Sequence, residues 1–128
     1  MSGYTDLIAW QKAHELTMHV YKMIEKFPQE EKYNFVSQVK RVALAIPTNI
    51  VGGFSRWSAK DSIYYYNQAD SALVELDYLA LLALEFGFIT NSELSKLNEK
   101  IEECTKLLRS WMKGVRERDA KWKAKQEA

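Results

Sequence analysis

The stretch SQVKRVALAIPTNIVGG, residues Ser37–Gly53, decides the fold of this 128-residue chain. Its apolar residues recur at steps of three and four, the spacing of one face of a helix. The predicted helix carries a proline at its middle, Pro47, and a glycine pair, Gly52 and Gly53, near its end. An interior proline removes a backbone donor and costs a helix about 3 kcal/mol. We therefore expect a buried second helix that is kinked at Pro47 and loosened in its last turns by the glycines.

Three further segments have the same helical spacing, and only short connections separate them. Helices are predicted over about residues 5–27, 31–56, 58–86 and from 90 onward. Short connections make neighbouring helices antiparallel. The predicted fold class is therefore all-α, an up-down-up-down antiparallel four-helix bundle with a kinked second helix. Residues 1–115 would form the bundle, and 116–128 a basic extension of its fourth helix.

Helix ends and one unusual surface refine this prediction. Thr5 or Asp6 could cap the first helix, and capping boxes are expected at the starts of the third and fourth helices, near Ser58 and Thr90.

The predicted third helix, residues 58–86, is apolar around most of its circumference. A helix of this kind is buried on more than one side, so we expect a second interface with another copy of the chain.

Composition and charge limit the function classes. Hydrophobic residues make up 47% and charged residues 27% of the chain, as in ordinary globular domains. Residues 113–128 hold six basic and three acidic side chains, so this tail carries +3 and the rest of the chain −2. The single cysteine, Cys104, lies on an apolar stripe and is expected to be a reduced core thiol. Without a recognisable signal peptide or spanning segment, we expect a cytoplasmic protein with no membrane partner.

Side chains with catalytic or metal-binding potential do not form a recognisable site. A di-metal bundle needs Glu-x-x-His pairs, and neither His14 nor His19 has a glutamate three residues before it. Asp70 and Asp77 could form an acid pair, but structural carboxylates are the favoured interpretation. Neither a Ser-His-Asp arrangement nor a phosphate loop is present. We expect no enzyme activity, no metal and no cofactor.

Three polar clusters remain as candidate sites. Gln38, Arg41 and Asn49 lie on the second helix, where Asn49 could bond the Ala43 carbonyl that Pro47 leaves free. The favoured interpretation of this cluster is ordinary surface with that one buried amide, and a functional polar site is the alternative.

The other two clusters combine basic and aromatic residues. Residues 56–60, RWSAK, could bind phosphate through their basic side chains and stack a base on the tryptophan. The alternative is a solvated corner with a packed Trp57. In the tail, Trp122 lies between Lys121 and Lys123, which suits RNA phosphates but equally a frayed, solvated helix end.

Several motifs together carry a family resemblance. They are Leu7–Ala13, Phe27-Pro28, Ser37–Arg41, Ala45–Ile50, Gly53–Arg56, Ala69–Ser71 and Glu75-Leu76. Over about residues 4–114 the chain resembles the four-helix-bundle family named after 23S ribosomal RNA intervening-sequence proteins. It departs from the family pattern at Gly52, where glutamate is usual, and at Lys40, where arginine is common.

The resemblance implies a function without catalysis. Members are similar to the accessory protein of diversity-generating retroelements, a bacterial pentameric barrel that binds nucleic acid. The leading hypothesis is thus a non-enzymatic homo-oligomer, a pentamer by resemblance, associated with structured RNA. The alternatives are a protein-interaction scaffold without nucleic acid and a binder of a small ligand between helices. The structural motif residues are Gln38, Pro47, Asn49 and Gly53. The candidate nucleic-acid-binding residues are Lys40, Arg41, Arg56, Lys60, Lys113, Arg116, Arg118, Lys121 and Lys123.

Overall fold

The computed structural model describes residues 3–127, and every regular element within them is helical. The four long helices are α1 (Ile8–Met23), α2 (Phe35–Phe54), α3 (Ala59–Glu85) and α4 (Asn91–Glu127). Three short 3₁₀ turns accompany them, η1 (Tyr4–Asp6), η2 (Ile24–Lys26) and η3 (Gln29–Glu31). The prediction of an all-α protein with four helices and no strand is therefore confirmed for residues 3–127.

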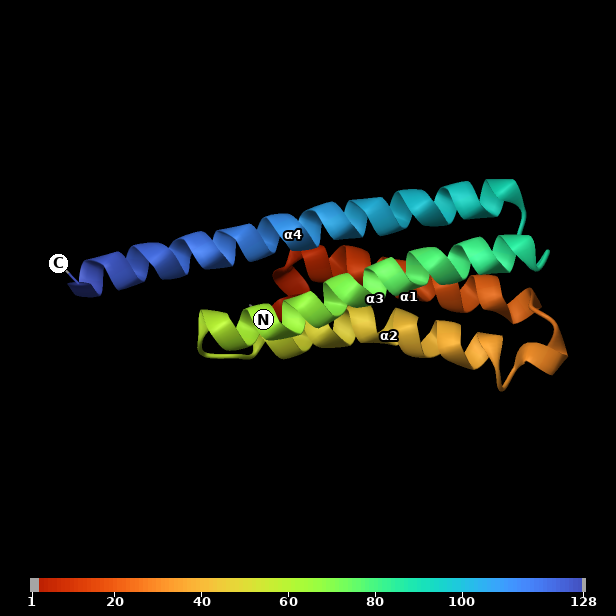
Figure 1. The fold of residues 1–128 in the computed structure, drawn as a ribbon, viewed down its shortest axis with the longest axis horizontal. Helices are drawn as coiled ribbons and strands as arrows, with labels where there is room; N and C mark the ends of the chain where they lie inside the picture. Colours follow the sequence, from red (N-terminus) through yellow and green to blue (C-terminus); the bar gives the residue numbers. More distant parts are fainter. Residues whose placement is uncertain (1–2, 128) are drawn as a thin grey trace.

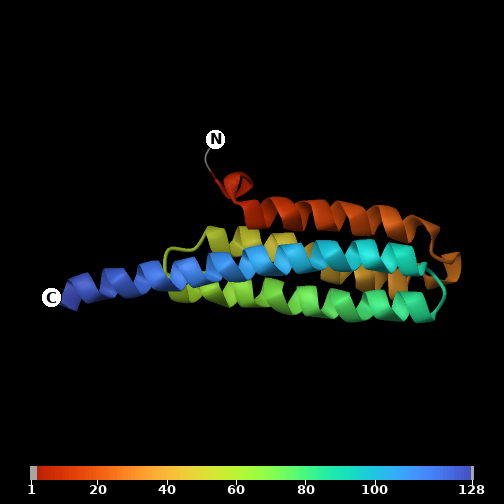
Figure 2. The same ribbon diagram turned by 90° about the horizontal axis from the view of Figure 1, so that it is seen from above.

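The four helices lie side by side, and the connections between successive helices are at alternate ends (Figure 1). α1 packs against α2 and α4, and α3 packs against the same two helices. Figure 2 shows the same arrangement from above, with α1 and α3 on opposite sides of α4. Each helix therefore has two neighbours, and a single core runs between all four.

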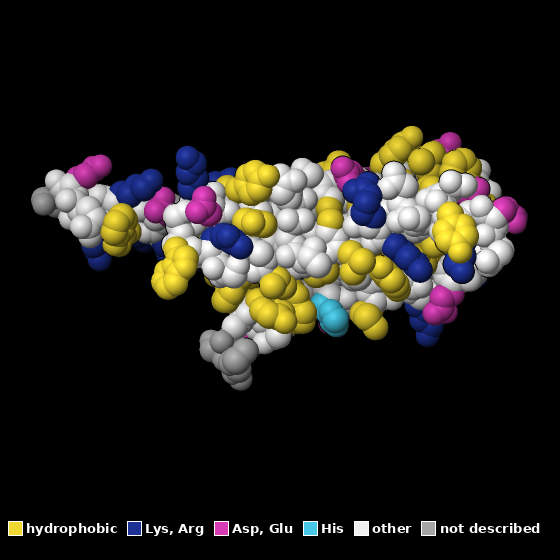
Figure 3. All heavy atoms as spheres, turned by 90° about the horizontal axis from the view of Figure 1, so that it is seen from below, with side chains coloured by type: hydrophobic (Ala, Val, Ile, Leu, Met, Phe, Trp, Pro, Cys, Tyr) yellow, Lys and Arg dark blue, Asp and Glu magenta, His cyan; other side chains and the backbone are white. Residues whose placement is uncertain are grey.

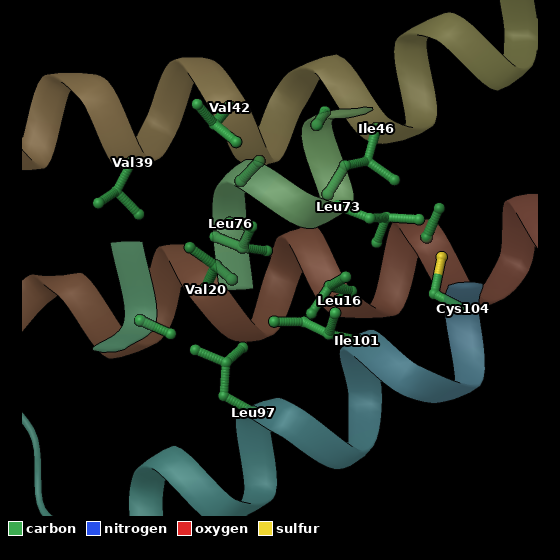
Figure 4. Close-up of a cluster of buried hydrophobic side chains, with 14 of the residues drawn as sticks. Leu16, Val20, Val39, Val42, Ile46, Leu73, Leu76, Leu97, Ile101 and Cys104 are labelled. Atoms are coloured by element: carbon green, nitrogen blue, oxygen red, sulfur yellow. The ribbon is translucent and has the colours of Figure 1, made fainter. Parts of the chain in front are cut away.

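Apolar side chains from every long helix meet in this core (Figure 4). Leu16, Ile46, Leu73 and Leu97, one from each helix, are fully buried there. Cys104 is also fully buried, and burial raises the pKa of its thiol to about 12. The expectation of a core thiol is thus confirmed, because the reactive thiolate is strongly disfavoured in this position.

The predicted caps of the later helices are present. The Ser58 hydroxyl accepts a hydrogen bond from the backbone N–H of Asp61 at 3.1 Å, at the start of α3. Thr90 and Glu93 each accept a hydrogen bond from the other's backbone N–H, at 3.2 and 2.9 Å, which is a complete capping box for α4. Gly87 ends α3 with a φ of +80°, a conformation that favours glycine.

The first two helices begin later than predicted. Residues 4–6 form a 3₁₀ turn, and neither Thr5 nor Asp6 makes a side-chain cap, because α1 starts at Ile8 after Leu7. The Gln11 side chain instead donates to the Thr5 carbonyl at 2.8 Å. α2 starts at Phe35 rather than near residue 31, since residues 29–31 form a separate 3₁₀ turn after Pro28.

α4 is the longest element and continues past the rest of the bundle as a lone helix (Figures 1 and 2). The basic tail is therefore helical as far as Glu127. Among residues 3–127, no helix is both long and apolar enough to cross a membrane.

Candidate nucleic-acid interface

The carbonyl that Pro47 leaves without its usual helical donor is bonded from another helix. The Thr17 hydroxyl of α1 lies 3.2 Å from the Ala43 oxygen and 2.9 Å from the Ala13 oxygen of its own helix. The expectation that Asn49 serves Ala43 is wrong, because the Asn49 amide donates to the Ala45 carbonyl at 2.7 Å. A threonine within an apolar helix seam was the sequence signal for this partner.

The glycine pair allows α2 and α3 to approach closely. A Cβ on Gly52 would lie 2.9 Å from the Tyr65 ring, and one on Gly53 would lie 2.5 Å from the Tyr66 ring. The Gly53 carbonyl also accepts a hydrogen bond from the buried Ser62 hydroxyl at 2.8 Å. The expected loosening is not observed, because α2 remains α-helical through both glycines to Phe54.

Next to these glycines, the α2–α3 corner carries a stacked arginine and an exposed tryptophan. The Arg56 guanidinium carbon lies 4.9 Å from the centre of the Tyr65 ring, and Arg56 Nε donates to the Gly52 carbonyl at 3.3 Å. Trp57 is fully exposed, at 104% of its reference area. The alternative of a corner with a packed tryptophan is therefore wrong. Tyr65 was not predicted as a partner of Arg56 from the sequence. The run of three tyrosines at 64–66 was the one signal that could have indicated it.

A groove joins this corner to the tail of α4. Lys60 from the first turn of α3 lines it together with Arg116 and Lys123 from α4, around a volume of about 350 Å³. Asp119 lies in the same groove and forms an ion pair with Lys123 at 3.2 Å. One basic residue of the corner, Lys60, and two of the tail, Arg116 and Lys123, therefore share one groove although they were predicted separately. We call this surface, residues 55–60 with α4 from Lys113 onward, the open end of the bundle.

The remaining tail residues differ in how strongly they are held. The Arg118 guanidinium carbon lies 5.0 Å from the centre of the Trp111 ring, so this arginine is stacked on the bundle. Lys113 reaches Glu117 only at 4.0 Å. Within residues 3–127, Arg116 and Lys121 have no carboxylate within 4.0 Å. The open end thus keeps exposed positive charge that its own carboxylates do not neutralise.

Lys40 and Arg41 do not belong to this surface. Both are exposed in the first half of α2, where Arg41 Nε donates to the Gln38 side chain at 2.9 Å and Lys40 lies over the Tyr21 ring. Arg41 and Arg56 are separated by roughly 22 Å along the helix axis at the standard rise per residue. On the face opposite α4, Lys and Arg side chains are scattered between hydrophobic patches (Figure 3). A single chain therefore does not bring these residues together with the open end.

The histidines and carboxylates considered for chemistry have structural surroundings. His14 stacks on Trp10, with 4.9 Å between ring centres. Arg109 makes two hydrogen bonds to the Asp70 carboxylate, at 2.8 and 3.2 Å, and this pair links α3 to α4. Burial, together with Lys100 and Lys96, lowers the pKa of His19. Within residues 3–127, no group of three His, Cys, Asp or Glu side chains is placed to hold a metal ion.

Comparison with known proteins gives one family and one fold. The family described as 23S rRNA-intervening sequence protein matches residues 5–110. No curated protein matches the chain. A crystal structure of a protein of unknown function from the S23 ribosomal protein family of Bacteroides thetaiotaomicron is similar at 24% identity and a TM-score of 0.77. The match covers 83% of this chain and 96% of that one, and at this identity it shows the fold alone.

Proposed function

The chain belongs to the 23S rRNA-intervening sequence protein family, and from this premise we propose that it is a non-enzymatic, oligomeric protein that binds structured RNA through its open end. The observation that carries the proposal is the groove in which Lys60 lies with Arg116 and Lys123. Basic side chains from two helices, and from distant parts of the chain, converge there on one exposed surface. Phosphate contacts by lysine and arginine supply most of the affinity for nucleic acid.

The proposal includes an arrangement of the whole chain. The bundle, residues 1–115, has the up-down-up-down antiparallel order with a kink of α2 at Pro47. Residues 116–128 act as a basic extension that carries half of the RNA surface. Because α4 extends beyond its neighbours, RNA can approach this extension from several directions.

Oligomerisation is the second part of the proposal, because one chain offers few phosphate contacts. Tyr64, Val74, Tyr78 and Leu81 of α3 are between 44% and 63% exposed, although they are large and apolar. Burying them against further copies would remove this surface from water and place several open ends in one particle. A pentamer follows from the resemblance. Light scattering of the purified chain tests this part, and a monomer at micromolar concentration would contradict it.

The same apolar side chains favour a second candidate function. A protein-interaction scaffold without nucleic acid would use α3 to hold a protein partner and would leave the open end solvated. The two candidates differ in one measurable property. Only RNA binding through phosphates weakens steeply as salt rises.

The test begins with the nucleic acid that copurifies with the chain at low salt. We expect RNA to be present and to be lost at high salt. The variant Lys60→Glu with Arg116→Glu and Lys123→Glu should abolish a low-salt RNA shift, because it reverses three charges in the groove. The matched control reverses Lys22, Lys32 and Lys106, which are exposed elsewhere on the bundle.

The outcomes separate the two functions. Loss of binding in the groove variant, with binding kept in the control, supports the proposal. Equal loss in both variants would indicate that only net charge matters and would contradict a site at the open end. Absence of RNA binding by the wild-type chain would leave the scaffold function in its place.

A further inference from the structure

Trp57 has an environment unusual for its residue type. It lies in the turn between α2 and α3, and its indole is fully exposed, at 104% of its reference area. Tryptophan is highly buried on average in folded proteins. Both faces of this ring are accessible within the described chain, so a planar partner can stack on it.

A second indole, Trp122, is also largely exposed. It continues the apolar stripe of α4 that contributes Leu108 and Trp111 to the bundle, and the last part of α4 continues past the ends of the other helices (Figure 1). Its side chain is 60% exposed. The stripe therefore ends in an aromatic ring that is mostly open to solvent.

Both indoles belong to the open end and lie close along the chain to lysines that line its groove, although neither indole lines the groove itself. Trp57 precedes Lys60 by three residues, and Trp122 is adjacent to Lys123, and both of these lysines line the groove. In Figures 1 and 2 the α2–α3 corner lies beside the last third of α4. Aromatic rings and cations are thus combined at the open end.

This combination suits one structural state of RNA. Proteins that bind single strands pair a positively charged groove with aromatic side chains on which bases stack. In an A-form duplex the base faces are already stacked and the major groove is too deep and narrow for side chains to read. Exposed indoles therefore gain contacts from unpaired nucleotides that they cannot gain from a duplex.

We propose that the open end binds unpaired nucleotides, such as those of RNA loops, with phosphates on Lys60, Arg116 and Lys123 and bases stacked on Trp57 and Trp122. This inference rests on the proposed function and names the ligand class of the same site. Two further cations belong to the open end. Arg56 is stacked on Tyr65, and Arg118 is stacked on Trp111.

The test compares two probes on the full chain, a short oligouridylate and a fully paired RNA duplex with the same number of nucleotides. The wild-type chain should bind the oligouridylate more tightly. Trp57→Ala and Trp122→Ala should each weaken oligouridylate binding by on the order of 5- to 100-fold, the usual effect of losing one stacked base. Their affinity for the duplex should not change.

Conservative and distant variants provide the controls. Trp57→Phe and Trp122→Phe keep a ring and should retain most of the binding. Tyr33 is 84% exposed, next to Lys32 at the opposite end of the bundle, so Tyr33→Ala removes an equally exposed ring and should leave both affinities unchanged. Oligouridylate should also quench tryptophan fluorescence, and this quenching should disappear in the double alanine variant.

Each other outcome overturns the inference in a distinguishable way. If the wild-type chain binds the duplex as tightly and the alanine variants bind oligouridylate like the wild type, the stacking inference fails and the proposed function stands. If the alanine variants lose both probes equally, the indoles act through fold or assembly and the inference fails. If neither probe binds, the proposed function fails with it.

Discussion

The two ends of the bundle use aromatic and charged residues in opposite ways. At the closed end, where α1 meets α2 and α3 meets α4, Phe27, Phe35, Phe86 and Phe88 pack on one another with ring centres 5.3–6.1 Å apart. Lys26 there forms an ion pair with Glu93 of the α4 capping box. At the open end the tryptophans face water and several cations lack a close carboxylate partner.

The difference indicates which end carries stability and which is available for binding. Rings that pack on each other contribute to stability through burial and aromatic contact. Rings and cations left exposed contribute little to folding and keep their surface for a ligand. The family match ends at residue 110, before Lys113. The α4 part of the open end therefore lies outside the segment that matches the family.

The largest expected effect is on stability, and it compares the removal of one aromatic ring at each end of the bundle. Phe27→Ala should lower the free energy of unfolding by about 3–5 kcal/mol, because it empties a buried aromatic site at the closed end. Trp57→Ala, which removes an even larger ring, should change it by less than about 0.5 kcal/mol. Urea unfolding measures both. Similar losses for the two variants would show that Trp57 is structural and that the ends do not differ.

A second effect tests the close approach of α2 and α3. Gly53→Ala should destabilise the fold by about 1–3 kcal/mol, because the new Cβ would overlap the Tyr66 ring. Gly114→Ala in α4 should instead stabilise by roughly 0.5–1 kcal/mol, since its new Cβ would meet only the end of the Arg118 side chain. Thermal melts of the pair give the sign of each change. A stabilising Gly53→Ala would refute the packing role.

A third effect concerns the donor for the carbonyl freed by Pro47. Thr17→Val should cost about 1–3 kcal/mol, because it leaves the buried Ala43 oxygen without a partner. Asn49→Ala should cost less, about 0.5–1.5 kcal/mol, because Asn49 is only half-buried and serves a different carbonyl. Chemical denaturation distinguishes them. The reverse ranking would restore Asn49 as the main side-chain partner of the backbone near Pro47.

The smallest effect is a pH dependence from His19. Its folded-state pKa is lowered by burial and by two lysines of α4, so the unfolded chain binds the proton more readily. Stability should therefore be full above the unfolded pKa and decrease as pH falls through it toward the folded value. His19→Gln should remove this slope, and Lys100→Gln should raise the pKa measured by NMR. An unchanged pKa in the second variant would exclude the lysine as a cause.

Local patterns in the sequence predicted much of the fold, and long-range contacts limited the rest. Spacing predicted the four helices, and Ser58 and Thr90 were predictable as caps because capping depends on residues within one turn. The contact between Thr17 and Ala43 joins positions 26 residues apart, and the packing of Tyr66 on Gly53 depends on how two helices approach. Neither of these two contacts can be read from a local sequence pattern.

The residues of the candidate site were likewise predictable from local sequence, but their arrangement in space was not. Arg56, Lys60 and the tail could be selected from charge and nearby aromatics alone. The meeting of Lys60 with Arg116 and Lys123 in one groove could not, because it depends on how far α3 and α4 overlap along their lengths. Lys40 and Arg41 were selected by the same criterion, yet they lie elsewhere on α2. Charge pattern identifies basic residues, whereas only tertiary packing decides which of them share a surface.

The most direct test of binding at the open end is the salt dependence of RNA affinity. The measurement is the slope of log affinity against log salt for the wild-type chain and for Lys60→Gln with Arg116→Gln and Lys123→Gln, with oligouridylate as probe. Each lost phosphate contact on a single strand should flatten the slope by about 0.7, so three contacts predict a change of about 2 for each bound chain. Equal slopes for the two proteins would show that these side chains do not contact phosphate and would contradict the account.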